Sequence, residues 1–395
     1  MLIDAGVVYA HFVLPASLRA GLPAIEEQWR DFGRDSRFVP RGRAAMFADR
    51  AAAFEGFLAG IGPRPKPTLH FLHLMLPHAP LLYLPTGRQY AAPLAITGFV
   101  NGGWGGDRAT AEAAEKRYLL QVGFVDRLVG RLLDRLEETG MLDATLLVVT
   151  SDHGCSFLPD APFRILNEAN YYEIAPVPLF IKAPGQRDGR VSDEPLETID
   201  VLPTVAALLD VELARPGDGR SALGSQGRDH RTFVLPSGKM WPVATNRARR
   251  AQAVADRISR LGAGTPWETM LARGPHGSLV GASVEGLADD EAAPYTVRLW
   301  DGFSAEMREG RPAPAWIEGE LMPGGGADAP VPVVAVAVNG VVGATAGVSR
   351  RKGGALGFQA MVAEALLRPG ANRIEVFVVD DRDPARVRLL RVPQA

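Results

Sequence analysis

Apolar positions between residues 43 and 262 follow two patterns that predict alternating helices and buried strands. Helical spacing predicts helices with one buried face over residues 43–61, 107–139 and 198–211. Short unbroken apolar runs, typical of strands covered on both faces, occupy residues 68–75, 144–150 and 177–182. This order of elements favours an α/β domain with a mainly parallel sheet flanked by helices.

The pattern changes after residue 275, where short apolar runs alternate with turn-forming residues. These runs are Tyr295–Trp300, Ala315–Leu321, Val331–Asn339, Phe358–Val362 and Arg373–Val379. Turn signals such as Asn339–Gly340 and Pro369–Gly370 separate them. We expect a C-terminal β-sandwich over residues 275–395. Residues 1–42 lack clear periodicity, and we interpret them as a connecting segment ahead of the α/β domain of residues 43–262.

Composition describes an ordinary globular chain and narrows its partners. The 395 residues are 47% hydrophobic and 22% charged, which excludes a disordered chain. With 43 basic and 45 acidic residues the net charge is −2, so we expect no nucleic-acid partner. The single cysteine, Cys155, excludes an internal disulfide framework. We find no signal peptide, and the longest uncharged run, residues 331–349, contains a proline and an Asn-Gly turn. We therefore expect no transmembrane segment.

A Ser-Asp-His-Gly sequence at residues 151–154 is the sharpest chemical signal. It follows the apolar run 144–150, and the carboxyl ends of strands in open α/β sheets are where ligands bind. A carboxylate oxygen from Asp152 and an imidazole nitrogen from His153 are a suitable ligand pair for a divalent metal ion. The alternative interpretation is that both side chains only cap a turn.

A second candidate is His78, which lies in the sequence Pro77-His78-Ala79-Pro80 just beyond the run 68–75. The two prolines restrict the backbone, so such a segment can hold an imidazole against an anion. A structural histidine is an equally good interpretation of His78 alone. Arg88 is a weaker candidate for anion contact, and its alternative is a solvated loop arginine.

The order of these motifs resembles the sulfatase-like domain of the alkaline phosphatase superfamily. The chain presents the Pro-His-x-Pro loop, a long helix, a strand ending in Asp-His-Gly, the strand Val177–Lys182 and an Asp-x-x-Pro-Thr helix from Asp200. It looks closest to membrane-anchored bacterial sulfatase-like proteins, relatives of phosphoethanolamine transferases and lipoteichoic acid synthases. Five motifs in register make a chance match improbable.

The resemblance implies a metal-dependent hydrolase or transferase of sulfate or phosphate esters, including esters on glycans or lipids. It implies that Asp152 and His153 bind a divalent metal ion such as zinc, calcium or manganese. His78, and more weakly Arg88, would contact the sulfuryl or phosphoryl oxygens. Members of the family are membrane-anchored and extracytoplasmic, whereas this sequence shows neither a signal peptide nor a transmembrane segment.

The sequence departs from the family pattern upstream of residue 68. We find no nucleophilic Ser, Thr or Cys at a helix start after a buried strand, and no upstream acidic metal ligand. We therefore expect an incomplete alkaline-phosphatase-like domain that is inactive, or nearly so, by itself. The alternative is a catalytically inactive binding or scaffolding protein with a glycan-binding β-sandwich. A metal-dependent nuclease is a weaker alternative, because no basic groove is evident.

Overall fold

The computed structural model describes residues 50–395 apart from short gaps. The gaps are residues 216, 225–227, 229, 236–237, 245–246, 262–266, 326–329, 352–354 and 384–385, and upstream only residues 10–11, 14 and 22 are described. The expected connecting segment of residues 1–42 thus lies almost wholly outside the described residues. The chain forms two compact units, residues 1–56 with 72–75, and residues 57–71 with 76–395. Everything discussed below belongs to the second unit, except for residues 72–75 and the first part of helix α4 (Arg50–Ala59).

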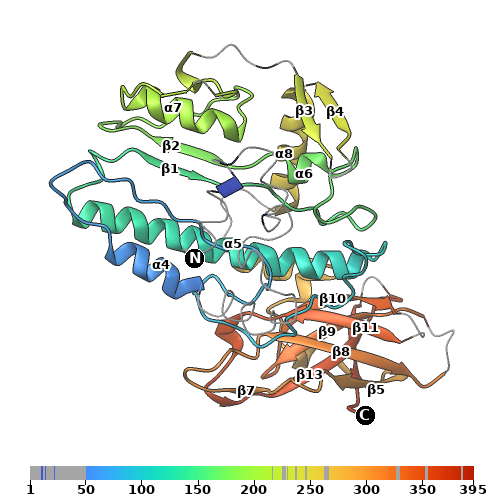
Figure 1. The fold of residues 1–395 in the computed structure, drawn as a ribbon. Helices are drawn as coiled ribbons and strands as arrows, with labels where there is room; N and C mark the ends of the chain where they lie inside the picture. The colour runs from blue at the N-terminus through green and yellow to red at the C-terminus, as the bar shows by residue number, and fades with distance from the viewer. Residues whose placement is uncertain are drawn as a thin grey trace. The chain divides into compact units, whose positions relative to one another are not determined.

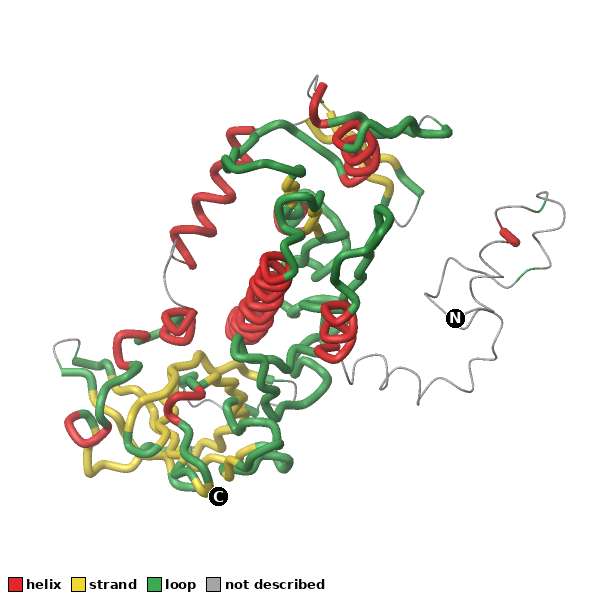
Figure 2. Tube along the Cα trace, turned by 90° about the vertical axis from the view of Figure 1, so that its left-hand side faces the viewer, coloured by secondary structure: helices red, strands yellow, loops and turns green. Residues whose placement is uncertain are grey.

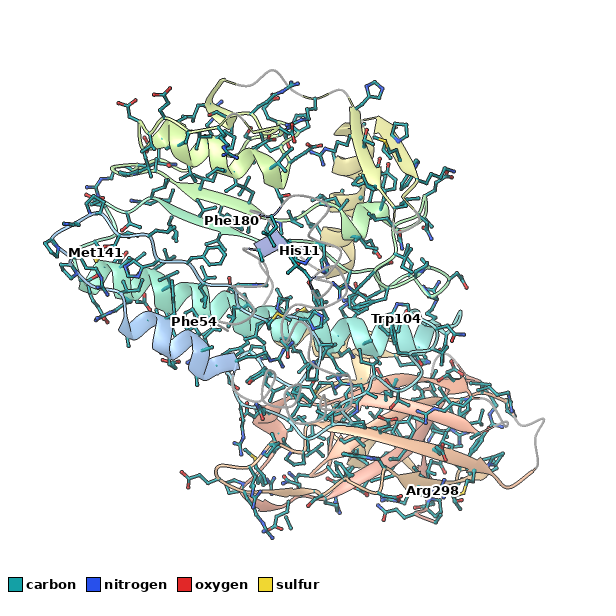
Figure 3. The ribbon with its side chains drawn as sticks, viewed as in Figure 1. His11, Phe54, Trp104, Met141, Phe180 and Arg298 are labelled. Carbon is teal, nitrogen blue, oxygen red and sulfur yellow. The ribbon has the colours of Figure 1, made fainter. Side chains whose placement is uncertain are left out.

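The long helix α5 (Arg108–Glu138) is the central element of the second unit (Figure 1). The Asp107 side chain accepts a hydrogen bond from the Thr110 N–H, so it caps the first turn. Gly140 adopts a φ of 67° just after the C-terminus, where glycine avoids the strain of a Cβ atom. Figure 3 shows Trp104 and Met141 at opposite ends of this helix.

We expected a mainly parallel sheet in the α/β region, but in the described residues this region forms a two-stranded antiparallel sheet. Strands β1 (Leu147–Thr150) and β2 (Leu179–Lys182) pair antiparallel. A parallel pair needs a long crossover element. Residues 151–178 instead form loops and one short helix, α6 (Tyr171–Ile174), and lead the chain back in the opposite direction.

The run of residues 68–75 forms neither a helix nor a strand, which corrects the predicted buried strand. Leu69 and Phe71 are 88% and 82% exposed. A short apolar run specifies an extended strand only where a neighbour supplies the ladder bonds, so the pattern alone was insufficient. The predicted helix over 198–211 is confirmed as a 3-10 turn, Thr198–Asp200, followed by α7 (Val201–Leu208).

One eight-stranded mixed sheet replaces the expected C-terminal sandwich. Its order is β5-β14-β13-β9-β10-β11-β8-β6, and only β14 and β5 run parallel. The strands are β5 (Ala288–Ala292), β6 (Tyr295–Leu299), β8 (Trp316–Pro323), β9 (Val333–Val338), β10 (Val341–Arg350), β11 (Leu356–Met361), β13 (Ile374–Asp380) and β14 (Arg388–Val392). All five predicted runs are strands of this sheet.

The eight-stranded sheet curls (Figure 2), so that its edge strand β6 approaches β14, the strand next to the other edge. Val297 of β6 pairs with Gln394, just beyond β14, through a parallel bridge. The curled sheet encloses one core, which contains Val336, Phe358 and Ile317, while Ala335, Phe377 and Leu389 form a second core on the opposite face. The apolar runs therefore predicted the strands correctly but not their arrangement, because the spacing of strands in sequence does not specify which strand edges pair.

The smaller elements complete the second unit. Strands β3 (His230–Val234) and β4 (Met240–Ala244) form a hairpin, β7 (Glu306–Met307) pairs with β12 (Gly370–Ala371), and α8 covers Arg247–Leu261. Helix α5 packs against β10 and β11. In the part of the chain that the structure describes, no helix is long and apolar enough to cross a membrane. The expected membrane association and extracytoplasmic location remain predictions.

Candidate anion-binding site

The loop that carries His78 is held by a glutamine of α5. Gln121 is completely buried, and its Nε2 donates hydrogen bonds to the carbonyls of Pro77 and His78, both at 2.9 Å. Its Oε1 accepts from the backbone N–H groups of Leu82 at 3.0 Å and Tyr83 at 3.3 Å. The carboxamide thus satisfies backbone groups that have no ladder partner, and it fixes the backbone on either side of the loop.

Asp152 and His153 follow β1 directly, as the sequence predicts. The His153 N–H donates to Asp152 Oδ1 at 2.9 Å, and the Asp152 carboxylate lies 3.6 Å from His153 Nε2. Gly154 donates its N–H to the Ile174 carbonyl at 2.7 Å. A Cβ atom at Gly154 would lie 2.3 Å from the Glu173 carbonyl oxygen. Glycine is therefore required there, because the backbone at α6 approaches so closely.

Arg164 brings the two motifs together. Its guanidinium lies 3.3 Å from His78 Nε2 and also contacts His153 Nε2. A guanidinium can only donate, so both Nε2 atoms must act as acceptors. The Nδ1 atoms of His78 and His153 lie 2.7 Å from the carbonyls of Ala79 and Gly154, which can only accept. Both imidazoles are therefore assigned, from their hydrogen-bond partners, as neutral rings with the proton on Nδ1.

Two features hold the segment that carries Arg164. The neighbouring Phe163 packs at right angles to Phe99 and Trp104, with ring centroids 5.5 Å apart in both pairs. The Trp104 Nε1 donates to the Ser156 carbonyl at 3.0 Å. The buried Asn170 donates from Nδ2 to the carbonyls that flank Arg164, Pro162 at 2.8 Å and Ile165 at 2.9 Å. The backbone around Arg164 is thus fixed although it lies in a loop.

Arg88 has a different environment from the one expected. Its guanidinium contacts Glu364 at 3.4 Å and donates to the carbonyls of Arg308 at 3.0 Å and Arg311 at 3.4 Å. Thr86 also donates to Glu364, at 2.9 Å, so this loop is fastened to the segments around the eight-stranded sheet. The structure therefore brings together His78, Asp152 and His153, and it places Arg88 in a separate network.

Sequence reasoning missed Arg164, Gln121 and Asn170. No periodic pattern distinguishes Arg164, which lies in the loop between β1 and β2 of an arginine-rich chain. Gln121 falls within the predicted helix, where a polar residue on a buried face could have signalled a role. Lys182, at the end of β2, donates to the carbonyls of Asp143 at 3.0 Å and Thr145 at 3.2 Å.

The donor set for a metal ion is partial. Asp152 and His153 offer an oxygen and a nitrogen, but the described residues contain no cluster of three or more metal-ligating side chains. Two protein ligands alone bind zinc poorly. His153 Nε2, which would contact a cation, is directed at the Arg164 guanidinium, so Arg164 would have to withdraw for the ring to bind a metal.

Comparison with known proteins confirms the predicted resemblance. The Sulfatase family model matches residues 24–211, a range that contains every site residue described above. Over these residues the chain is similar to the sulfatases of the alkaline phosphatase superfamily, and the large curled mixed sheet lies beyond the matched range.

Two curated relatives and one solved structure illustrate the relationship. The chain is 36% identical over 126 residues to the multifunctional alkaline phosphatase superfamily protein PehA of Trinickia caryophylli, covering 30% of this chain and 24% of that protein. It is 29% identical over 226 residues to the choline-sulfatase of Rhizobium meliloti (strain 1021), covering 54% and 43%. The phosphonate monoester hydrolase SpPMH of Silicibacter pomeroyi aligns at 28% identity with a TM-score of 0.36, covering 47% and 44%. The chain thus spans less than half the length of each of these proteins.

Proposed function

We propose that this chain carries the anion-binding part of a hydrolase of sulfate or phosphate esters. In this proposal Arg164, His78 and His153 surround the tetrahedral oxyanion of the substrate. The observation that carries it is the Arg164 guanidinium, which donates to two neutral imidazoles from loops that are 75 residues apart in sequence. The relative from Rhizobium meliloti is named a choline-sulfatase, which favours this reading over a protein that only binds or scaffolds.

The charge balance of the site supports an anionic ligand. The hydrogen bonds of Arg164 to His78 and His153 go to uncharged rings. Within the described ranges, no salt bridge joins a carboxylate to this guanidinium; the Asp152 carboxylate lies 3.6 Å from His153 Nε2, on the other side of the contact. A planar guanidinium recognises sulfate or phosphate oxygens in a bidentate manner. An ester oxyanion would therefore replace the two imidazole acceptors at Arg164.

The His78 imidazole would then change its role. With an oxyanion bound, His78 can donate from Nε2 only if the ring proton moves there from Nδ1. This ring could thus stabilise charge that develops on the ester oxygens. The arrangement suits a sulfur or a phosphorus centre equally, and esters on glycans or lipids belong to the proposed substrate class.

Asp152 and His153 are proposed as two ligands of a divalent metal ion, with zinc, calcium and manganese as candidates. Such an ion would supply Lewis-acid stabilisation of the ester oxygens. The 69% exposure of the Asp152 side chain leaves its carboxylate accessible to a cation. We assign no nucleophile among the described residues, and we propose Arg164 in the anion-contact role that the sequence suggested for Arg88.

The proposal is tested by ester hydrolysis. Purified protein is assayed with 4-nitrophenyl sulfate, a 4-nitrophenyl phosphodiester and a phosphonate monoester, with zinc, calcium or manganese added. Because we assign no nucleophile, we expect only slow turnover of at least one ester. Arg164→Gln should lower kcat/KM for that ester about 100-fold, as for loss of one donor to a developing oxyanion. Arg187→Gln, which removes an exposed arginine paired with Asp143, should leave kcat/KM unchanged.

Two outcomes would contradict the proposal. A wild-type kcat/KM in Arg164→Gln would show that Arg164 does not contact the substrate. Binding of sulfate by the wild-type protein without turnover of any ester would contradict the proposed hydrolase activity. It would favour a protein that binds the oxyanion without catalysing ester hydrolysis.

A further inference from the structure

We propose that two buried carboxamides, Gln121 and Asn170, are positioning residues that set the separation of His78 and Arg164. The proposal rests on the proposed anion site for its functional meaning. Both side chains are completely buried, and each binds the backbone of a loop that carries one of the two site residues. Neither side chain is proposed to contact substrate.

Gln121 holds the backbone at His78 itself. One of its two amide donors goes to the His78 carbonyl and the other to the preceding Pro77 carbonyl. Pro77 and Pro80 have no backbone N–H group, so the loop itself contains few donors that could replace these two hydrogen bonds. Loss of the two donors would remove two hydrogen bonds from these carbonyls and release the segment that directs the imidazole.

Asn170 performs the corresponding task for Arg164. Its Nδ2 atom spans the arginine by donating to Pro162 and Ile165, and its Oδ1 accepts from the Asn167 N–H at 2.8 Å. The carboxamide therefore closes residues 162–165 into a fixed bend with Arg164 inside it. The side chain of Asn170 belongs to the residue that precedes α6, so the bend is anchored to a helix.

The contact between the two loops is sensitive to small shifts. In the described chain, no backbone hydrogen bond joins the His78 loop to residues 162–165. The Arg164–His78 distance is 3.3 Å, near the upper end of hydrogen bonding. A shift of about 1 Å in either loop would break this contact. The two carboxamides thus determine whether Arg164 bridges both imidazoles or only His153.

A third carboxamide provides a matched control. Asn372 is buried in the region of the eight-stranded sheet, and its Nδ2 donates to the carbonyls of Ala305 at 3.1 Å, Arg368 at 3.0 Å and Gly370 at 3.2 Å. It binds loop backbone in the same manner as Gln121 and Asn170. It has no hydrogen bond to a residue of the anion site.

The experiment compares Gln121→Glu, Asn170→Asp and Asn372→Asp in the full chain. Each replacement is isosteric, keeps the acceptor oxygen and removes both amide donors. Two quantities are measured: the 15N chemical shifts of the His78 and His153 ring nitrogens, which report the tautomer, and the dissociation constant for inorganic sulfate. Thermal unfolding verifies that each variant is folded. Gln121→Asn, shorter by one methylene, replaces Gln121→Glu if that variant does not fold.

We expect Gln121→Glu and Asn170→Asp to weaken sulfate binding at least tenfold. The His78 ring should lose its fixed Nδ1–H tautomer in both variants, while Asn372→Asp retains the wild-type spectrum and binds sulfate within twofold. Wild-type ring 15N shifts and sulfate affinity in Gln121→Glu and Asn170→Asp would overturn the inference. An equal loss of sulfate affinity in Asn372→Asp would overturn it as well. If wild-type protein binds no sulfate, the proposed function fails, but the ring nitrogens still decide whether the carboxamides position His78.

Discussion

The eight-stranded sheet and the anion-binding loops are stabilised in different ways. In the sheet, backbone ladders join all eight strands, and side chains such as Phe358 and Phe377 are buried on its two faces. Between β1 and β2, residues 151–178 have no ladder of that kind. They are held by side chains that bind loop backbone, with Asn170 as the clearest example.

This difference separates stability from geometry. Burial of apolar surface stabilises the sheet and does not depend on the exact position of any one polar atom. The loops depend on individual hydrogen bonds, each with a small net free energy but a strict distance requirement. Substitutions in the sheet should therefore change mainly the free energy of unfolding, and substitutions in the loops should change mainly the site.

The largest loss of stability is expected for Phe358→Ala. Phe358 lies in β11 and is 1% exposed in the core that the curled sheet encloses. Truncation of a buried Phe costs about 3–5 kcal/mol, because a cavity is added to the lost burial. Denaturant unfolding measures the change, and Met322→Ala, at a half-exposed side chain of β8, is the control. A loss below about 1 kcal/mol for Phe358→Ala would contradict the role given to this core.

A polar cluster outside the sheet gives the next largest effect. Burial would raise the pKa of Asp200, but hydrogen bonds from Arg228 and from the N–H groups of Arg220 and Glu197 outweigh burial and lower the pKa to about 2. Asp200→Asn should destabilise the chain by about 3 kcal/mol, because the buried carboxylate is lost and Arg228 retains only Glu197 as a charged partner among the described residues. Thermal unfolding at pH 7 checks this value, and an unchanged midpoint would refute it.

The Asp200 cluster also predicts that the free energy of unfolding depends on pH. The pKa of Asp200 is lower in the folded state than in the unfolded state, so its contribution of about 2 kcal/mol is complete above pH 4 and is lost as the pH falls towards 2. In Asp200→Asn this part of the acid transition should disappear. An identical acid-unfolding profile for variant and wild type would show that Asp200 does not carry it.

A smaller effect is expected for Trp104→Phe. The replacement keeps a buried ring but removes the Nε1 hydrogen bond to the Ser156 carbonyl. The loss should be about 1 kcal/mol, the net value of one hydrogen bond. Because Trp104 packs against Phe163, next to Arg164, sulfate binding should weaken as well. A change in the free energy of unfolding without any change in sulfate affinity would show that the packing of Trp104 on Phe163 does not position Arg164.

Local patterns predicted the elements well, and long-range contacts explain what they missed. Helix α5 begins and ends within a residue of the predicted bounds, because Asp107 and Gly140 act locally. The Asn339–Gly340 turn was also foreseen, since positive φ values of 54° and 86° suit these residues. Strand direction, the closure of the sheet and the exposure of Phe71 depend on partners distant in sequence, which no local pattern contains.

The candidate site shows the same division. Asp152, His153 and His78 stood out because strand ends and prolines mark them in the sequence. Arg164 and its supporting Asn170 lie in a loop without periodicity, and only the fold places Arg164 beside His78. Arg88 had an equally suggestive neighbourhood in the sequence, but Glu364, far along the chain, engages it.

Sulfate binding by Arg164→Gln and Arg88→Gln, measured by calorimetry against wild type, tests the central claim most directly. Arg164→Gln should lose at least tenfold in affinity while its free energy of unfolding changes by less than about 0.5 kcal/mol, as is usual for a surface substitution. Arg88→Gln should bind sulfate as wild type does, because its guanidinium belongs to the Glu364 network. Wild-type affinity in Arg164→Gln together with a loss in Arg88→Gln would contradict the account.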